Sequence, residues 1–218
     1  MQKVDIAVVD YGMGNLRSVS KALEHVANGK SVVVTSDTAL IQAAERVVFP
    51  GQGAMPDCMH ELDARHLREV IIDAAKNKPF LGICIGMQLL FDHSEEGDTA
   101  GLGLLKGNVK RFAERLADNN GDKLKVPHMG WNQVFQTTNN QKQAHPLWAD
   151  IEDATRFYHV HSYYAAPLDS AVTTGETEYP NRFTSAVAFE NIFATQFHVE
   201  KSAQAGLQLL ANFVNWKP

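Results

Sequence analysis

Cysteine is scarce in this chain, which has 2 cysteines, 8 prolines and no long apolar run among its 218 residues. Two cysteines are too few for the disulfide framework of a small secreted protein, so we expect a reducing, cytoplasmic location. The apolar segments, such as Ile6-Ala7-Val8-Val9, are far shorter than the roughly 18 residues of a membrane-spanning helix. We therefore expect neither a membrane-spanning segment nor a secretory signal peptide.

An excess of charge of one sign is also absent. The 20 Lys and Arg residues and 25 Asp and Glu residues give a net charge of −5, spread along the chain without a basic stripe. A nucleic-acid partner is unexpected, because a phosphate backbone requires clustered positive charge. The 44% hydrophobic and 21% charged residues are typical of a globular protein. Without repeats or a proline-rich linker, the sequence favours a single domain over residues 1–218.

The first hundred residues alternate between strand and helix periodicity, which is typical of a parallel sheet wrapped by helices. Short β-branched runs predict strands at residues 4–9, 31–35, 46–49 and 79–83. Apolar side chains three or four positions apart predict crossover helices at residues 16–26 and 67–74. These features indicate an α/β fold of three layers, an open and mostly parallel sheet flanked by helices.

From about residue 108 the pattern changes to short strands separated by polar turns. Strands are predicted at residues 131–135, 155–160, 186–190 and 192–197, and polar turns at residues 118–122 and 137–143. A closing amphipathic helix carries Leu207, Leu210, Phe213 and Val214. We expect this half to add an antiparallel extension to the sheet.

The strongest local signal is Gly82-Ile83-Cys84-Ile85-Gly86, which follows a predicted buried strand and precedes an apolar helix expected from about Gly86. Two glycines permit a sharp strand-to-helix turn that exposes the central side chain, as in the nucleophile elbow of Gly-x-Ser-x-Gly hydrolases. A helix N-terminus then favours the thiolate form of Cys84. The alternative is a structural core cysteine, and the flanking glycines favour the nucleophile.

A second signal is Phe197-His198-Val199-Glu200 at the end of a predicted apolar strand. The strand period of two would place His198 and Glu200 on one face. A carboxylate beside the imidazole would fix its tautomer and stabilise the imidazolium after it takes a thiol proton. An ordinary surface histidine and glutamate is the alternative, and the pair gains weight only together with Cys84.

A third signal is the glycine-rich loop Gly51-Gln52-Gly53, which follows the strand preceding that of Cys84. Acyl transfer needs backbone N–H donors at the tetrahedral oxyanion, one normally from the residue after the nucleophile, here Ile85, and another from a neighbouring loop. The alternative is a plain turn in which the glycines only supply positive φ. The three signals together favour an enzyme.

Other motifs are incomplete. The segment Asp10-Tyr11-Gly12-Met13-Gly14-Asn15 is half of a dinucleotide-binding fingerprint, but Arg17 stands where the third glycine belongs. Lys106-Gly107 lacks the following Ser or Thr of a P-loop. His159 and His161 share one strand face and could begin a metal site, yet no Cys or carboxylate at ligand spacing accompanies them. We expect these two histidines to form a hydrogen-bonded pair near the cleft, with no metal.

Together, these residues resemble the class I, triad-type glutamine amidotransferases. The cysteine elbow and the His-x-Glu segment occur throughout that class. Additional motifs follow the order of one branch, whose members supply ammonia to a cyclase of histidine biosynthesis; they lie at residues 10–19, 82–90, 127–132, 161–163 and 197–202. The resemblance covers nearly the whole chain and implies a flavodoxin-like amidotransferase fold.

The resemblance also implies roles for individual residues. Cys84 would be the nucleophile, His198 the base and Glu200 its orienting carboxylate. The residues implied around the substrate are Gln52 and Ile85 for the oxyanion-hole amides, Gln88 and Glu96 for the amino end of glutamine, and Ser162 and Tyr163 near its carboxylate. Two positions depart from the family pattern: Val199 stands where many members have proline, and Gln52 stands where a small aliphatic residue is expected.

The implied reaction is hydrolysis of the L-glutamine side-chain amide through a cysteine thioester, with no metal or organic cofactor. The implied partner is a (β/α)₈-barrel cyclase subunit that forms a heterodimer with this chain and receives the ammonia. The residues implied at that interface are Asn15, His128, Met129, Trp131 and Lys201, with residues 128–132 forming a loop. For Met129 and Trp131, the alternative is core filling.

Three other functions remain open from the sequence. A paralogous amidotransferase subunit would feed a different synthase, and a freestanding γ-glutamyl hydrolase would turn over fully without a partner. A non-catalytic binding or redox-sensing domain would keep Cys84 without needing His198 and Glu200.

Overall fold

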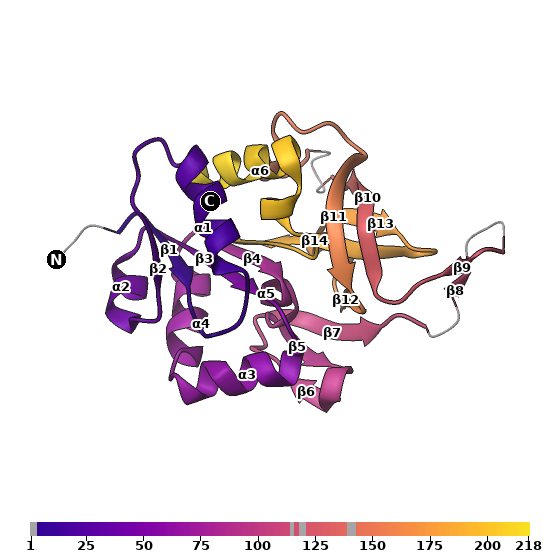
Figure 1. The fold of residues 1–218 in the computed structure, drawn as a ribbon, viewed down its shortest axis with the longest axis horizontal. Helices are drawn as coiled ribbons and strands as arrows, with labels where there is room; N and C mark the ends of the chain where they lie inside the picture. Colours follow the sequence, from indigo (N-terminus) through magenta and orange to yellow (C-terminus); the bar gives the residue numbers. More distant parts are fainter. Residues whose placement is uncertain (1–3, 114–115, 118–120, 139–142) are drawn as a thin grey trace.

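A computed structural model describes residues 4–113, 116–117, 121–138 and 143–218. One sheet of 13 strands extends through these residues, with its main path in the order β2-β1-β3-β4-β15-β14-β12-β7-β5-β6 (Figure 1). Its strands are β1 (Ile6–Val9), β2 (Val32–Thr35), β3 (Arg46–Gly51), β4 (Phe80–Cys84), β5 (Phe91–Ser94), β6 (Thr99–Ala100), β7 (Leu105–Arg111), β10 (His128–Gln136), β11 (Thr155–His161), β12 (Tyr163–Pro167), β13 (Thr173–Glu178), β14 (Arg182–Phe189) and β15 (Ile192–Thr195). The strands β8 (Leu116–Ala117) and β9 (Lys123–Leu124) form a separate two-stranded ribbon.

The parallel half of the sheet contains β2, β1, β3, β4 and β15. All residues of β1, β3, β4 and β15 are buried, as expected for parallel strands covered on both faces. Their carboxyl ends lie at one edge of the sheet, where ligands bind in open α/β folds. The predicted α/β architecture is confirmed.

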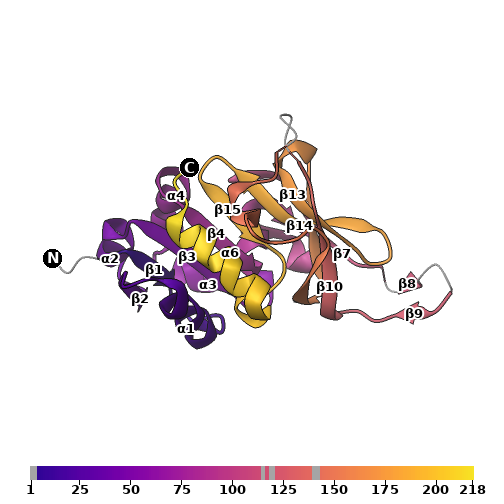
Figure 2. The same ribbon diagram turned by 90° about the horizontal axis from the view of Figure 1, so that it is seen from above.

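Helices cover both faces of this parallel half (Figures 1 and 2). They are α1 (Leu16–Val26), α2 (Thr38–Ala43), α3 (Met55–Ala64), α4 (Arg68–Asn77), α5 (Ile85–Gln88) and α6 (Ala203–Asn215). The pair α1 and α6 packs on one face, whereas α2, α3 and α4 lie on the other. The apolar stripe of α1 points inward, with Val19 and Leu23 buried. None of the helices in these ranges is long and apolar enough to cross a membrane.

The second half adds antiparallel strands, as predicted. Strand β14 joins the parallel half by pairing with β15, and β12 then pairs with β7. Strands β10 and β11 form a long antiparallel pair in which His128 lies opposite His161. Of the two predicted polar turns, residues 118–120 and 139–142 lie outside the described residues.

The sequence did not predict several elements. The helices α2 and α3 and the strands β5, β6, β7, β12 and β13 were missed. The apolar helix expected from Gly86 is only one turn long, because α5 ends at Gln88 and the chain enters β5 at Phe91. Leu89 and Leu90 are buried, and a short apolar run in a core has no periodicity that separates helix from strand.

Candidate active site

A cavity of about 280 Å³ lies at the carboxyl ends of β3, β4 and β15. It is lined by Gln52, Gly53, Cys84, Ile85, Gln88, Glu96, Pro127, Val160, His161, Ser162, Tyr163 and His198. Its size suits an amino-acid-sized ligand, because drug-sized molecules occupy roughly 300–1,000 Å³. Every residue expected around the substrate from the sequence therefore lines one cavity, and Glu200, expected only to orient His198, is hydrogen-bonded to that ring.

Cys84 occupies a strained turn between β4 and α5. Its backbone has φ +56° and ψ −111°, a left-handed conformation that costs energy for a residue with a Cβ atom. The neighbouring glycines allow close packing: a Cβ atom at Gly86 would lie 1.9 Å from the Phe49 carbonyl oxygen, and one at Gly82 would lie 2.9 Å from the Gly86 carbonyl oxygen. This is the geometry of a nucleophile elbow, with the Cys84 side chain at the cavity wall.

His198 and Glu200 are paired by a hydrogen bond of 2.8 Å between His198 Nδ1 and Glu200 Oε1. The prediction that a strand would place them on one face is wrong, because β15 ends at Thr195 and residues Val199–Lys201 form a 3₁₀ turn. The turn folds the carboxylate back against the ring more closely than alternate positions of an extended strand would. His198 is held in turn by its backbone N–H, which donates to the Tyr158 carbonyl at 2.9 Å.

The environment of His198 makes it a strong base. Burial alone would lower its pKa. The neighbouring Cys84 and Glu200 side chains raise the pKa by more than burial lowers it, so the pKa of His198 is about 10. Because Nδ1 faces the carboxylate, Nε2 is the nitrogen left for proton exchange, and it makes no hydrogen bond to another side chain. The three side chains can therefore generate a thiolate and an imidazolium at the cavity wall.

The glycine-rich loop borders the same cavity. Gln52 and Gly53 line it, and Gly53 has φ +109°, a conformation that favours glycine. The Cys58 thiol donates to the Gln52 carbonyl oxygen at 3.7 Å, and burial raises the pKa of that thiol to about 11, so it remains a donor. Ile85 begins α5, directly after Cys84, where helix N–H groups lack intrahelical partners.

Two side chains on the cavity wall present acceptors for a cationic group. Gln88 Nε2 donates to the Tyr163 carbonyl at 3.1 Å and to Gln196 Oε1 at 2.9 Å, which leaves Gln88 Oε1 buried without a partner. Glu96 accepts the Met55 N–H at 2.8 Å and keeps its carboxylate at the cavity. Gln88 and Glu96 can thus hold an ammonium group.

Gln196 is a residue that the sequence analysis missed. Its Nε2 lies 3.9 Å from Cys84 Sγ, and its Oε1 accepts from Gln88, so it connects the cysteine with the cavity wall. The available signal was a polar residue inside the buried segment that leads to His198, because glutamine is rarely fully buried without a specific partner.

Four of the five residues expected at a partner interface are at least partly exposed. Met129 and Trp131 are 61% and 48% exposed, so core filling is wrong for both. Asn15 and Lys201 are partly exposed: Asn15 caps α1 through the Ser18 N–H, and Lys201 lies 5.9 Å from the Tyr158 ring centre.

The prediction for His128 is wrong, because His128 is only 3% exposed and offers no surface to a partner. It lies in β10, so residues 128–132 form a strand and not the expected loop. Aromatic rings from distant segments, including Phe112 and Tyr179, enclose it.

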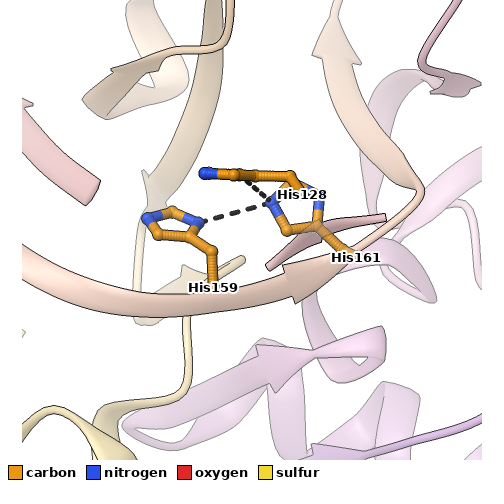
Figure 3. A group of neighbouring side chains, drawn as sticks. All are labelled: His128, His159 and His161. Carbon is orange, nitrogen blue, oxygen red and sulfur yellow. Dashed lines mark hydrogen bonds between the residues drawn. The ribbon is translucent and has the colours of Figure 1, made fainter. Parts of the chain in front are cut away.

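The expected pair of His159 and His161 is present, with 3.3 Å between His159 Nδ1 and His161 Nε2. His128 joins them, with its Nδ1 3.2 Å from the same His161 nitrogen (Figure 3). The result is a buried cluster of three imidazoles beside the cavity.

Comparisons with known proteins agree on one family. The family model Glutamine amidotransferase class-I matches residues 7–216. Imidazole glycerol phosphate synthase subunit HisH of Aromatoleum aromaticum is 63% identical over 215 residues, which cover 98% of this chain and 99% of that protein. The subunit of the same name from Thiobacillus denitrificans is 64% identical over 216 residues, which cover 99% and 92%.

The fold is also found in solved structures. The glutaminase domain of Trypanosoma brucei CTPS, solved with bound acivicin, has a TM-score of 0.64 and 18% sequence identity to this chain. The match covers 99% of this chain and 95% of that one. At this identity, the likeness shows a shared fold alone.

Proposed function

The chain belongs to the class I glutamine amidotransferase family, and on that premise we propose that it is the glutaminase subunit of an imidazole glycerol phosphate synthase. The observation that carries the proposal is the arrangement of Cys84, His198 and Glu200 around a cavity of amino-acid size. A redox-sensing or purely binding domain would have no need for the buried pair of His198 and Glu200.

In the proposed reaction, His198 takes the proton of Cys84 and the sulfur attacks the side-chain amide carbon of glutamine. The backbone N–H groups of Gln52 and Ile85 stabilise the resulting oxyanion. His198 then gives its proton to the departing nitrogen, and ammonia leaves as the carbon–nitrogen bond breaks. Water hydrolyses the thioester of Cys84 by the reverse proton movements and releases glutamate.

Substrate recognition follows from the cavity wall. We assign the α-ammonium group of glutamine to Gln88 and Glu96, whose side chains line the cavity and offer oxygen acceptors. Ser162 and Tyr163 also line the cavity and would lie near the α-carboxylate. No step of this chemistry requires a metal or an organic cofactor.

A partner is part of the proposal, because ammonia released into neutral water would become protonated and lose its nucleophilicity. The (β/α)₈-barrel cyclase subunit would receive it and form imidazole glycerol phosphate and aminoimidazole carboxamide ribotide. Met129 and Trp131, two large exposed apolar side chains on one face of β10, support docking at this surface. Two free cysteines support a cytoplasmic location, and the continuous sheet supports one domain.

The test is transfer of nitrogen from glutamine labelled with ¹⁵N in its side-chain amide, in the presence of excess unlabelled ammonium. The chain combined with the cyclase subunit should place the label in imidazole glycerol phosphate with little dilution. Hydrolysis without label in this product would point to a freestanding hydrolase or to a paralogous synthase. The same mixture with Cys84→Ala is the control, and it should incorporate only unlabelled ammonium.

A further inference from the structure

The cluster of His128, His159 and His161 is not used by the proposed glutaminase reaction. We propose that these three imidazoles form a binding site for a divalent late first-row metal ion, with Zn²⁺ as its occupant, and that the bound ion inhibits glutamine hydrolysis. The binding claim stands on the cluster itself, whereas the inhibition claim rests on the proposed function.

The spacing of the ring nitrogens matches that of a metal site. His161 Nε2 lies 3.2 Å from His128 Nδ1 and 3.3 Å from His159 Nδ1 (Figure 3). Two imidazole nitrogens bound to one Zn²⁺ at roughly 2.0–2.1 Å with tetrahedral angles are about 3.4 Å apart. Two of the three edges therefore already have the required length, and all three candidate ligand atoms lie within 4.8 Å of one another.

The strands hold these side chains in place. His128 in β10 lies directly opposite His161 in β11, and His159 is two residues before His161 on the same face. The ring of His128 stacks on that of His159, with 4.7 Å between the ring centres. A site on paired strands needs little backbone rearrangement to close around an ion.

The second ring nitrogen of His161 is bound as it is in metal sites. His161 Nδ1 donates to the Tyr163 carbonyl at 2.7 Å, which leaves Nε2 with its lone pair directed at the other two rings. His128 Nε2 accepts from Asn132 Nδ2 at 3.2 Å, so the ring proton of neutral His128 lies on Nδ1 and has to move to Nε2 or leave before Nδ1 binds an ion. The contact of His161 Nδ1 with the Tyr163 carbonyl is of the kind that orients a metal-binding histidine and raises its affinity for the ion.

The cluster is buried and neutral, and one of its ring nitrogens has no hydrogen-bond partner. The three rings have six nitrogens, of which five have hydrogen-bond partners, whereas His159 Nε2 is buried without one. Burial lowers the pKa of His128 to about 4, that of His161 to about 3, and that of His159 well below 6.5. All three are neutral at pH 7, which is the form that binds metals.

The donor set selects the ion. Three imidazoles without a carboxylate or thiolate favour Zn²⁺, Cu²⁺, Ni²⁺ or Co²⁺ over Mg²⁺ and Ca²⁺, which prefer oxygen ligands. Three histidines also form the protein part of known zinc sites. His161 lines the cavity, so an ion can reach the cluster from the side that admits glutamine.

Two connections between the histidine cluster and the active site would let a bound ion inhibit the reaction. The Tyr163 carbonyl accepts from both His161 and Gln88, so one backbone group connects the cluster with a side chain of the cavity wall. His198 lies within electrostatic range of His159 and His161. A dication in the cluster would therefore disfavour the imidazolium form of His198 that the reaction requires.

The binding test uses Co²⁺, whose visible absorption reports tetrahedral coordination. Because Cys84 and His198 could also bind such an ion, the titration is performed in the Cys84→Ala variant. We expect one Co²⁺ per chain, and we expect affinity to fall about 100-fold or more in Cys84→Ala/His159→Phe, since contacts to the second ring nitrogen alone are worth 10–100-fold. The matched control is Cys84→Ala/His93→Gln, which removes an exposed histidine paired with Asp98 and should bind normally.

Two results would overturn the site: no Co²⁺ spectrum in Cys84→Ala, or an unchanged affinity after His159→Phe. Thermal melting verifies that the variant is folded, and His159→Gln replaces it if the Phe variant does not fold. Zn²⁺ binding displaces Co²⁺ in the same titration and identifies the preferred ion.

The inhibition test is separate and uses otherwise wild-type chain with the cyclase subunit. Zn²⁺ should reduce glutamate production, and the reduction relative to each protein's own untreated rate should be largely lost in His159→Phe. Equal inhibition of both proteins would place the inhibitory ion at Cys84 and contradict this part. Complete absence of glutaminase activity would refute the proposed function but leave the Co²⁺ result unaffected.

Discussion

His198 Nδ1 and Glu200 Oε1 are 2.8 Å apart, in a pair whose side chains are only 2% and 1% exposed. This contact places the Nδ1 proton on the carboxylate side and leaves Nε2 for Cys84. The carboxylate therefore orients the base and stabilises its charged form without moving a proton itself.

Substitutions should separate the role of His198 as the base from the role of Glu200 as its orienting carboxylate. We predict that Glu200→Gln lowers kcat/KM for glutamine by about 10⁴-fold and that His198→Ala lowers it by about 10⁶-fold, as in serine-triad enzymes. Steady-state glutaminase assays of both variants check the order. A larger loss in Glu200→Gln would contradict the assigned roles.

The nucleophile can be removed without disturbing the fold. Cys84→Ala should abolish glutamine hydrolysis, because it deletes the sulfur, while retaining the Cβ atom and opening only a small space. Synthesis from external ammonium in the complex should persist, since the cyclase reaction does not use this residue. Glutamate production by the purified variant at the wild-type rate would refute the assignment.

The close packing of the turn around Cys84 should contribute to the stability of the fold. Gly86→Ala should lower the free energy of unfolding by about 3 kcal/mol or more, because the new Cβ atom would meet the Phe49 carbonyl oxygen at 1.9 Å. Gly29→Ala is the control: Gly29 has φ +85° but no atom within 4 Å of its would-be Cβ, so only backbone strain of about 1–2 kcal/mol is expected. Urea unfolding measures the free energy of unfolding of both variants. Equal decreases in the two variants would show that the close packing at Gly86 has no energetic role.

A pH dependence of stability is expected from His145. Burial lowers its pKa to about 4, and its Nδ1 accepts the Leu147 N–H at 3.2 Å. As the pH falls, His145 is protonated in the unfolded chain before it is protonated in the folded one. The stabilising contribution of neutral His145 is therefore complete above pH 6.5 and is lost as the pH falls toward 4.

His145→Asn removes this titration and keeps a side chain that can cap the same turn. The wild-type protein should lose about 1–2 kcal/mol more than the variant between pH 7 and pH 4, after allowance for partial exposure. Parallel slopes of unfolding free energy against pH in the two proteins would contradict the prediction.

Sequence patterns predicted those parts of the molecule in which local chemistry decides the structure. The strands β1, β3 and β4 are buried on both faces, so their apolar runs are continuous. The turn at Cys84 required glycines at Gly82 and Gly86 for close packing, and these appear directly in the sequence.

The remaining features depend on contacts between distant segments. His128 is polar and near a predicted strand, but it is buried because rings such as Phe112 and Phe183 close over it. The pairing of His198 with Glu200 was expected, but the 3₁₀ turn that forms it has no periodicity to reveal it. The role of Gln196 follows from its contacts with Gln88 and Cys84, which join segments far apart in the sequence.

The proposed function requires a partner that controls glutamine hydrolysis by this chain. The loop Gly51-Gln52-Gly53 contains two glycines, so one peptide can turn away from the oxyanion site, and one oxyanion donor is worth on the order of 10²–10³ in rate. Partner-dependent activation also requires two states with different affinity for the cyclase.

The most direct measurement is steady-state glutamine hydrolysis by the chain alone, with the cyclase subunit, and with the cyclase subunit plus an analogue of its substrate. We predict a low rate for the isolated chain and a rise of about 10²-fold or more when the cyclase and its ligand are both present. Equal rates under all three conditions would contradict the account.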